Sequence, residues 1–205
     1  VIGAKTIGTA TAPITTASDA QDSSFGSSVR NRESAMSNMV AQMFKDTLGK
    51  DDPNFIGIQN PGGTRASLQS GEITYKDAAL VLPFANSLMT TTVTGEQFKQ
   101  VLEEQWQHDE KGQVPSRPFL SLGLSNNVSY TYDENLPEGQ RITSVWVNGK
   151  PIDPKASYTV GSGSFLINGG DNFHTLAKGS RPVDTGKVDL DAWVSWIKDL
   201  SLIHI

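Results

Sequence analysis

The stretch 55–65 has the sequence FIGIQNPGGTR, and the interpretation of the fold starts from it. Its apolar first half predicts a short buried strand over 55–58, and the Asn-Pro-Gly-Gly that follows predicts a tight loop where that strand ends. In the preceding segment, 32–48, apolar residues such as Met36, Val40 and Phe44 recur at helical spacing, and Gly49 follows as a stop signal. The sequence therefore predicts a helix that leads into a buried strand.

Capping signals predict two further helices downstream. Thr74 is the expected N-cap of a short helix that ends before Pro83, and Thr94 with Gln97 forms the capping box of a helix over 95–107. The other predicted elements are strands over 87–93, 128–132, 141–147 and 158–161, a hairpin turn at 148–149, a glycine-rich loop over 161–173 and a last helix over 189–200. This mixture predicts the α+β class, as a single mixed α/β domain with several helices around a mixed sheet.

The amino-terminal segment has a different character from the rest of the chain. Residues 1–29 begin with a few apolar residues and continue as a Thr-, Ser-, Ala- and Asp-rich stretch without periodicity, which is typical of an extended arm or a surface loop. We expect an arm over 1–26 that packs on a single domain over 27–205. The abrupt first and last residues indicate a piece cut from a longer protein.

Composition excludes several classes of function. The chain has 205 residues, of which 37% are hydrophobic and 19% charged, so it can bury a core. Its net charge of -5 argues against a nucleic-acid polymer as partner. The absence of cysteine excludes disulfides, thiolate zinc sites and cysteine nucleophiles. No run of 18 apolar residues is present, so we expect no membrane-spanning helix.

The common catalytic and metal-binding motifs are also missing from the sequence. His108, His174 and His204 are far apart and lack metal-ligand spacing, so surface or loop histidines are the better interpretation. There is no GxSxG nucleophile elbow, no P-loop and no GxGxxG after a predicted strand. We therefore expect no catalytic residue, metal site or cofactor in this chain.

The remaining candidates are polar residues at the tips of loops. Asn60 and Arg65 flank two glycines that let the backbone approach a ligand closely, and the guanidinium of Arg65 can form a fork on an anion. Arg30, just before the first predicted helix, can meet the same anion. Each has a plainer interpretation as well, namely a simple turn with a surface arginine or a solvated cluster of charges.

Two loop phenylalanines and one aspartate complete the set of candidates. Phe84 follows Pro83 in a bend and Phe165 lies in the glycine-rich run, so the two rings can sandwich a flat base, with about 1–3 kcal/mol of stacking per base. A single phenylalanine is more often a core residue. Asp171, after two glycines, can accept hydrogen bonds from two sugar hydroxyls or can serve as a turn aspartate. Together, the anion ligands, the two rings and the diol acceptor match a nucleoside monophosphate.

Four segments resemble motifs of one family, the C-terminal domain of the 5'-nucleotidases, which also includes UDP-sugar hydrolases and 2',3'-cyclic phosphodiesterases. Their order and spacing agree with the family from about residue 27 to about residue 200, which is nearly the whole chain. The segments are RNRES at 30–34, NPGGTR at 60–65 with GEIT at 71–74, LPFAN at 82–86 with TG at 94–95, and FLINGGD at 165–171.

The resemblance implies a role for each matching residue. Arg30, Asn60 and Arg65 would hold the substrate phosphate or its neighbours. Phe84 and Phe165 would clamp the base, Asp171 would bind the ribose hydroxyls, and Asn86 matches a position that contacts the base in some members. Three glycines of the family pattern are replaced, by Ser37, Ala85 and Asn172. Asparagine tolerates positive φ, so we expect the loop at Asn172 to keep its shape.

The resemblance also implies which parts of the enzyme lie elsewhere. In the family, an N-terminal metallophosphoesterase domain with two divalent metal ions performs hydrolysis, and its D-x-H and G-N-H motifs have no counterpart here. This chain would then bind a nucleoside or nucleotide without hydrolysing it, as part of a hydrolase of phosphoric monoesters. The resemblance further implies an extracellular, cell-wall or periplasmic location.

Two alternatives stay open at this point. The domain can be a non-catalytic surface or interaction module with a vestigial pocket. It can also belong to a cyclic-nucleotide phosphodiesterase or a nucleotide-sugar hydrolase, because a clamp of two rings accepts any base.

Overall fold

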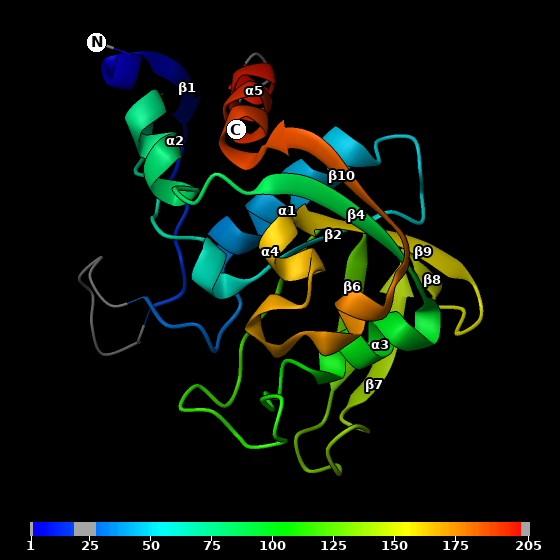
Figure 1. Cartoon of the computed structure of the whole chain (residues 1–205). Helices are drawn as coiled ribbons and strands as arrows, with labels where there is room; N and C mark the ends of the chain where they lie inside the picture. Colours follow the sequence, from blue (N-terminus) through cyan, green and yellow to red (C-terminus); the bar gives the residue numbers. More distant parts are fainter. Residues whose placement is uncertain (1, 19–27, 202–205) are drawn as a thin grey trace.

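A five-stranded mixed sheet organises the part of the chain that the structure, a computed structural model, describes, which is residues 2–18 and 28–201 (Figure 1). The expected boundary between residues 26 and 27 and the predicted loop histidine His204 lie outside the described residues. In spatial order, the strands are β10 (Ser180–Val188), β4 (Ser87–Thr94), β9 (Ser157–Gly163), β2 (Ile56–Gln59) and β5 (Gly123–Leu124). Strands β2 and β9 run parallel, whereas the other neighbours are antiparallel, so the predicted mixed sheet is confirmed.

Helices cover both faces of this sheet. Figure 1 shows α1 (Ala35–Leu48), α2 (Tyr75–Val81) and α5 (Asp189–Ser201) gathered on one side and α3 (Gly95–Glu103) on the other. The remaining elements are a ribbon of β1 (Thr6–Ala10) with β3 (Gly71–Thr74), a small sheet of β6 (Val128–Tyr132), β7 (Ile142–Val147) and β8 (Lys150–Pro151), the short helix α4 (Ser164–Ile167), and 3-10 turns η1 (Ile2–Ala4), η2 (Pro61–Gly63), η3 (Gly170–Asn172) and η4 (His174–Lys178).

The hydrophobic core consists of two clusters, one on each face of the sheet. Consecutive residues of a strand point to opposite faces, and accordingly Leu88 joins one cluster while Met89 joins the other. The first cluster packs α1, α2 and α5 around Phe44 and Trp193, and the second packs α3 and the small sheet around Phe98. The sheet thus separates two hydrophobic clusters, and the connecting loops lie at the ends of its strands.

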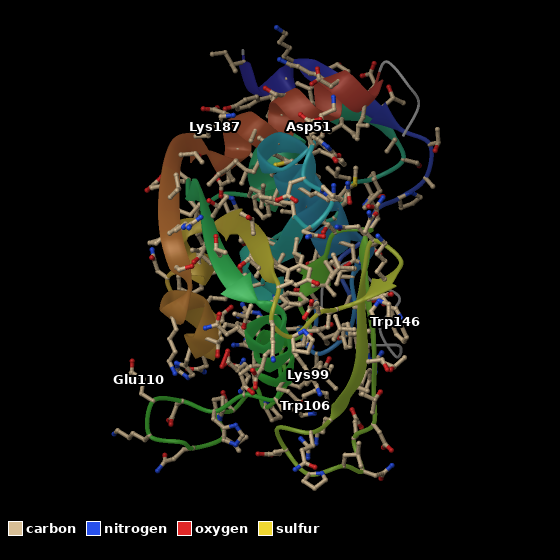
Figure 2. The ribbon with its side chains drawn as sticks, turned by 90° about the vertical axis from the view of Figure 1, so that its right-hand side faces the viewer. Asp51, Lys99, Trp106, Glu110, Trp146 and Lys187 are labelled. Carbon is tan, nitrogen blue, oxygen red and sulfur yellow. The ribbon has the colours of Figure 1, made fainter. Side chains whose placement is uncertain are left out.

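Two predicted helices have different ends in the structure. Helix α1 begins at Ala35 rather than near residue 32, because the hydroxyl of Ser34 accepts a hydrogen bond from the N–H of Ser37 and caps the helix there. Helix α3 has the predicted capping box but ends at Glu103, not at residue 107. The segment after it leaves the helix axis and forms a long loop, and Figure 2 shows the part with Glu110 projecting beyond Trp106, at the end of the molecule opposite α5.

Strands β1 and β10 have no counterpart among the predicted elements. Strand β1 lies in the segment expected to be an extended arm or a surface loop, and it pairs antiparallel with β3. Strand β10 is exposed or half-exposed along its whole length, so it shows no apolar alternation. Its hydrogen bonds to β4 hold it at the edge of the sheet. The predicted glycine-rich loop over 161–173 contains the end of β9, helix α4 and η3.

Candidate functional site

One pocket of about 390 Å³ gathers the residues that the sequence predicted as ligand-binding. We call it the loop pocket, because loops at one edge of the five-stranded sheet form most of its lining. All seven predicted residues line it: Arg30, Asn60, Arg65, Phe84, Asn86, Phe165 and Asp171. The structure therefore brings together residues that are up to 141 positions apart in the chain, from Arg30 to Asp171.

The sheet topology explains why these loops meet. Strands β2 and β9 are parallel neighbours, so the loops after their carboxyl ends, η2 and α4, lie at the same edge. Strand β4 runs antiparallel to β9 and starts where β9 ends, since Leu88 pairs with Gly163. The segment 84–86 therefore reaches the same edge. Arg30 is tied to this region through its backbone carbonyl, which accepts a hydrogen bond of 2.8 Å from the N–H of Ser121.

Both phenylalanine rings are exposed at the loop pocket rather than buried in the core. Their exposed fractions are 57% for Phe84 and 50% for Phe165, so the core interpretation of these residues does not hold. Phe165 packs over Gly170, where an added Cβ would lie 2.6 Å from its ring carbons. The guanidinium carbon of Arg65 lies 5.9 Å from the centroid of the Phe84 ring, which places a cation over that ring. Exposed aromatic rings beside a pocket are suited to stacking on a planar ligand.

Asp171 is held by a neighbouring amide. The Nδ2 of Asn60, a buried residue, donates a hydrogen bond of 2.9 Å to Oδ2 of Asp171. The backbone of Asp171 has a φ of 56°, in the left-handed region that non-glycine residues rarely adopt. One carboxylate oxygen is thus engaged by Asn60, and no side chain among the described residues donates a hydrogen bond to the other, which can accept from a ligand. Asn172 also has a positive φ, 60°, as expected from its replacement of a glycine.

Positive charge dominates one end of the loop pocket. Burial lowers the pKa of the Arg30 guanidinium, the charges of Arg117 and Arg65 lower it further, and the carboxylate of Asp171 acts in the opposite direction. Arg117 belongs to the long loop that follows α3. Within residues 2–18 and 28–201, no ion pair joins any of these three arginines to a carboxylate. An anionic ligand would offset this repulsion.

Asp189 lines the loop pocket but was not predicted from the sequence. It opens α5 and is only 3% exposed. Its Oδ1 accepts a hydrogen bond from the N–H of Leu190, and its Oδ2 accepts one from Nδ2 of Asn86. Burial raises the pKa of this carboxyl, while the hydrogen bonds from Leu190 and Asn86 oppose the rise. An aspartate at the start of a predicted helix has a sufficient local explanation as a helix-capping residue, so the sequence offered no reason to place it in a site.

None of the described histidines lines the loop pocket. Among the described residues, no three His, Cys, Asp or Glu side chains are grouped so that they could hold a metal ion. His108 pairs with Glu138, and His174 contacts the backbone carbonyl of His108, so both histidines are engaged outside the loop pocket. No described helix is long and apolar enough to cross a membrane.

Comparison with known proteins yields consistent similarities. A family model described as the 5'-nucleotidase C-terminal domain matches residues 6–178. A probable 5'-nucleotidase of Treponema pallidum is 35% identical over 127 residues, which cover 59% of this chain and 21% of that protein. A NAD 5'-nucleotidase of Haemophilus influenzae is 33% identical over 155 residues, covering 70% and 25%. A crystal structure of a 5'-nucleotidase precursor from Thermus thermophilus matches with a TM-score of 0.78 at 28% identity, covering 98% of this chain and 38% of that one. The chain therefore spans only 21% and 25% of the length of these two curated relatives.

Proposed function

Since this chain belongs to the family of 5'-nucleotidase C-terminal domains, we propose that its loop pocket binds the nucleoside and phosphate parts of a nucleoside 5'-monophosphate. One observation carries the proposal. Two exposed rings, one oriented carboxylate and two arginines from four separate segments line the same pocket of about 390 Å³. A volume of this size suits a small-molecule ligand.

Each part of the ligand has a matching group in this proposal. The base stacks between Phe84 and Phe165, whose apolar faces would otherwise stay in water. The ribose hydroxyls donate to the oxygen of Asp171 that Asn60 leaves available. The phosphate faces Arg30 and Arg65, and it offsets the repulsion between these two guanidinium groups.

The chemistry of hydrolysis is proposed to come from another domain of the same polypeptide. A metallophosphoesterase domain would hold two divalent metal ions, and the donor set for such a site is absent from the described residues of this chain. The present domain, proposed to extend over 27–205 with an arm over 1–26, would position the nucleotide. Extracellular, cell-wall or periplasmic location is part of the same proposal, and relatives named as 5'-nucleotidases support the substrate class.

Titration of this chain with adenosine and AMP tests the proposal. We expect both ligands to shift the ring proton resonances of Phe84 and Phe165, with AMP binding more tightly because of Arg30 and Arg65. Phe165→Ala should weaken adenosine binding by about tenfold, as expected from the loss of one stacking face. Tyr132→Ala is the matched control, because Tyr132 is 51% exposed but lies outside the loop pocket.

The same titration distinguishes the alternative of a vestigial pocket. If neither ligand moves the two ring resonances at millimolar concentration, the loop pocket does not bind nucleosides and the chain is better described as an interaction module. If Tyr132→Ala weakens binding as much as Phe165→Ala does, the base does not stack at the loop pocket.

A further inference from the structure

Asn86 is fixed by Asp189 through both its backbone and its side chain. The backbone N–H of Asp189 donates a hydrogen bond of 2.9 Å to the carbonyl of Asn86. Nδ2 of Asn86 lies 3.5 Å from Oδ2 of Asp189 and donates to it. The other oxygen of Asp189 accepts a bond of 2.7 Å from the N–H of Leu190, so the carboxylate itself is held in place by the first turn of α5. Asn86 and Asp189 both line the loop pocket.

The chemistry of this pair determines which end of the Asn86 amide faces away from Asp189. A carboxylate only accepts hydrogen bonds, whereas a carboxamide has a donating nitrogen and an accepting oxygen. The nitrogen must therefore face Asp189, and the carbonyl oxygen Oδ1 points elsewhere. Within the described part of the chain, Oδ1 of Asn86 has no hydrogen-bond partner among the side-chain bonds of the structure. The half-buried Asn86 thus offers the loop pocket an unused acceptor.

Asn86 also lies between the two segments that carry the exposed rings. It follows Phe84 by two positions, and its Cβ lies 3.3 Å from the position that a Cβ on Gly163 would occupy. Gly163 in turn precedes Phe165 by two positions. A flat base inserted between Phe84 and Phe165 would therefore present one of its edges to the Asn86 amide.

We propose that Asp189 is a positioning residue that keeps the Asn86 carbonyl oxygen toward the base, so that the loop pocket prefers bases with an amino group at that edge, such as adenine. This inference rests on the proposed function, because it assumes that a base occupies the space between the rings. An acceptor that the bound base covers and leaves without a donor is unfavourable, so a base that lacks the amino group binds more weakly. In this proposal the carboxylate, which is only 3% exposed, acts through the orientation of Asn86.

Three nucleosides that differ at one position of the base test the inference. Purine riboside lacks the 6-amino group of adenosine, and inosine has an oxygen in its place. We expect this chain to bind adenosine about fivefold more tightly than purine riboside, which corresponds to one hydrogen bond of ordinary strength. Inosine should bind no more tightly than purine riboside, because its oxygen at the 6-position faces another acceptor. Calorimetry or the ring resonances of Phe84 give the three dissociation constants.

Asp189→Asn should remove this preference without removing binding. An asparagine at position 189 that still accepts from Leu190 with its oxygen presents its nitrogen to Asn86, so the Asn86 amide reverses and the adenosine-to-purine-riboside ratio should fall to about one or below. Asp191→Asn removes one negative charge from an exposed position on the same helix and should leave the adenosine-to-purine-riboside ratio unchanged. Asn86→Ala should also abolish the ratio, which keeps the inference testable if Asp189→Asn does not fold.

The outcomes separate the two proposals. Equal binding of adenosine and purine riboside to the unmodified chain would overturn the inference about Asp189 and leave the nucleoside pocket standing. A preference that persists in Asp189→Asn would show that the carboxylate does not orient the amide. Failure of all three nucleosides to bind would overturn the proposed function together with the inference.

Discussion

At Ala85, the backbone adopts a φ of 54° between an exposed ring and an amide fixed by Asp189. A side chain with a Cβ costs about 1–2 kcal/mol in this left-handed region, and glycine avoids that cost. We expect Ala85→Gly to raise the free energy of unfolding by about 1 kcal/mol, after the greater entropy of glycine in the unfolded chain is subtracted. Urea unfolding followed by tryptophan fluorescence measures the change.

Asn172→Gly is the matched control for Ala85→Gly, since Asn172 has nearly the same φ, 60°, in another loop of the same edge. Asparagine visits the left-handed region more easily than alanine, so the gain in stability should be smaller. Equal gains at the two positions would show that strain at Ala85 is not the cause.

The residues of the candidate site could largely be predicted, because packing and turn formation do not require this combination of residues at the tips of separate loops. Phe84, Phe165 and Asp171 each had a plain alternative, and only their joint match to one family favoured binding. Asp189 could not be found in this way. Its position at the start of an amphipathic helix already explains an aspartate, and its contact with Asn86 joins residues 103 positions apart. Long-range pairing of this kind leaves no local pattern.

Among the helices and strands, those with an apolar face of their own could be predicted from the sequence. Helix α1 buries Met36, Val40 and Phe44 at helical spacing, so its existence follows from the sequence. Strand β10 buries none of its residues fully and forms because β4 supplies hydrogen-bonding partners along its edge. Strand β1 likewise depends on β3, which lies more than 60 positions later in the chain. Strands formed by a partner rather than by their own alternation cannot be recognised from local sequence.

The packing of α1 on β2 depends on the missing side chain of Gly57. A Cβ at this position would lie 2.0 Å from the carbonyl oxygen of Ala41, so the helix could not keep its distance from the strand. We expect Gly57→Ala to lower the free energy of unfolding by about 3 kcal/mol, because overpacking at a backbone contact forces the helix to move. Denaturant unfolding measures this change.

Gly3→Ala provides the control for Gly57→Ala. Its added Cβ would meet only Lys76 Cβ at 3.7 Å, an ordinary van der Waals distance, so stability should stay within about 0.5 kcal/mol of the unmodified chain. If Gly57→Ala is as stable as Gly3→Ala, α1 does not need the close approach to β2.

For the whole molecule, the half-buried carboxyl of Glu104 and the buried carboxyl of Asp189 link stability to pH. Glu104 connects the end of α3 to η4, where its two oxygens accept hydrogen bonds from the N–H and the hydroxyl of Thr175. Burial raises the pKa of Glu104 above its ordinary value of 4.5, and it raises the pKa of Asp189 as well. The folded state therefore retains protons that the unfolded state has already lost. Stability is fully present below the unfolded pKa and is lost as pH rises through the raised folded pKa.

Glu104→Gln should flatten this dependence of stability on pH. The amide cannot ionise, so unfolding free energies measured from about pH 4 to about pH 8 should fall less steeply than those of the unmodified chain. The fall that remains is attributable to Asp189 and to repulsion within a chain of net charge -5. Glu96→Gln on the same helix removes the same charge from an exposed position and should keep the original slope. Parallel pH profiles for the two variants would show that burial of Glu104 does not contribute, whereas a flatter profile for Glu104→Gln alone assigns that part of the pH dependence to the contact between α3 and η4.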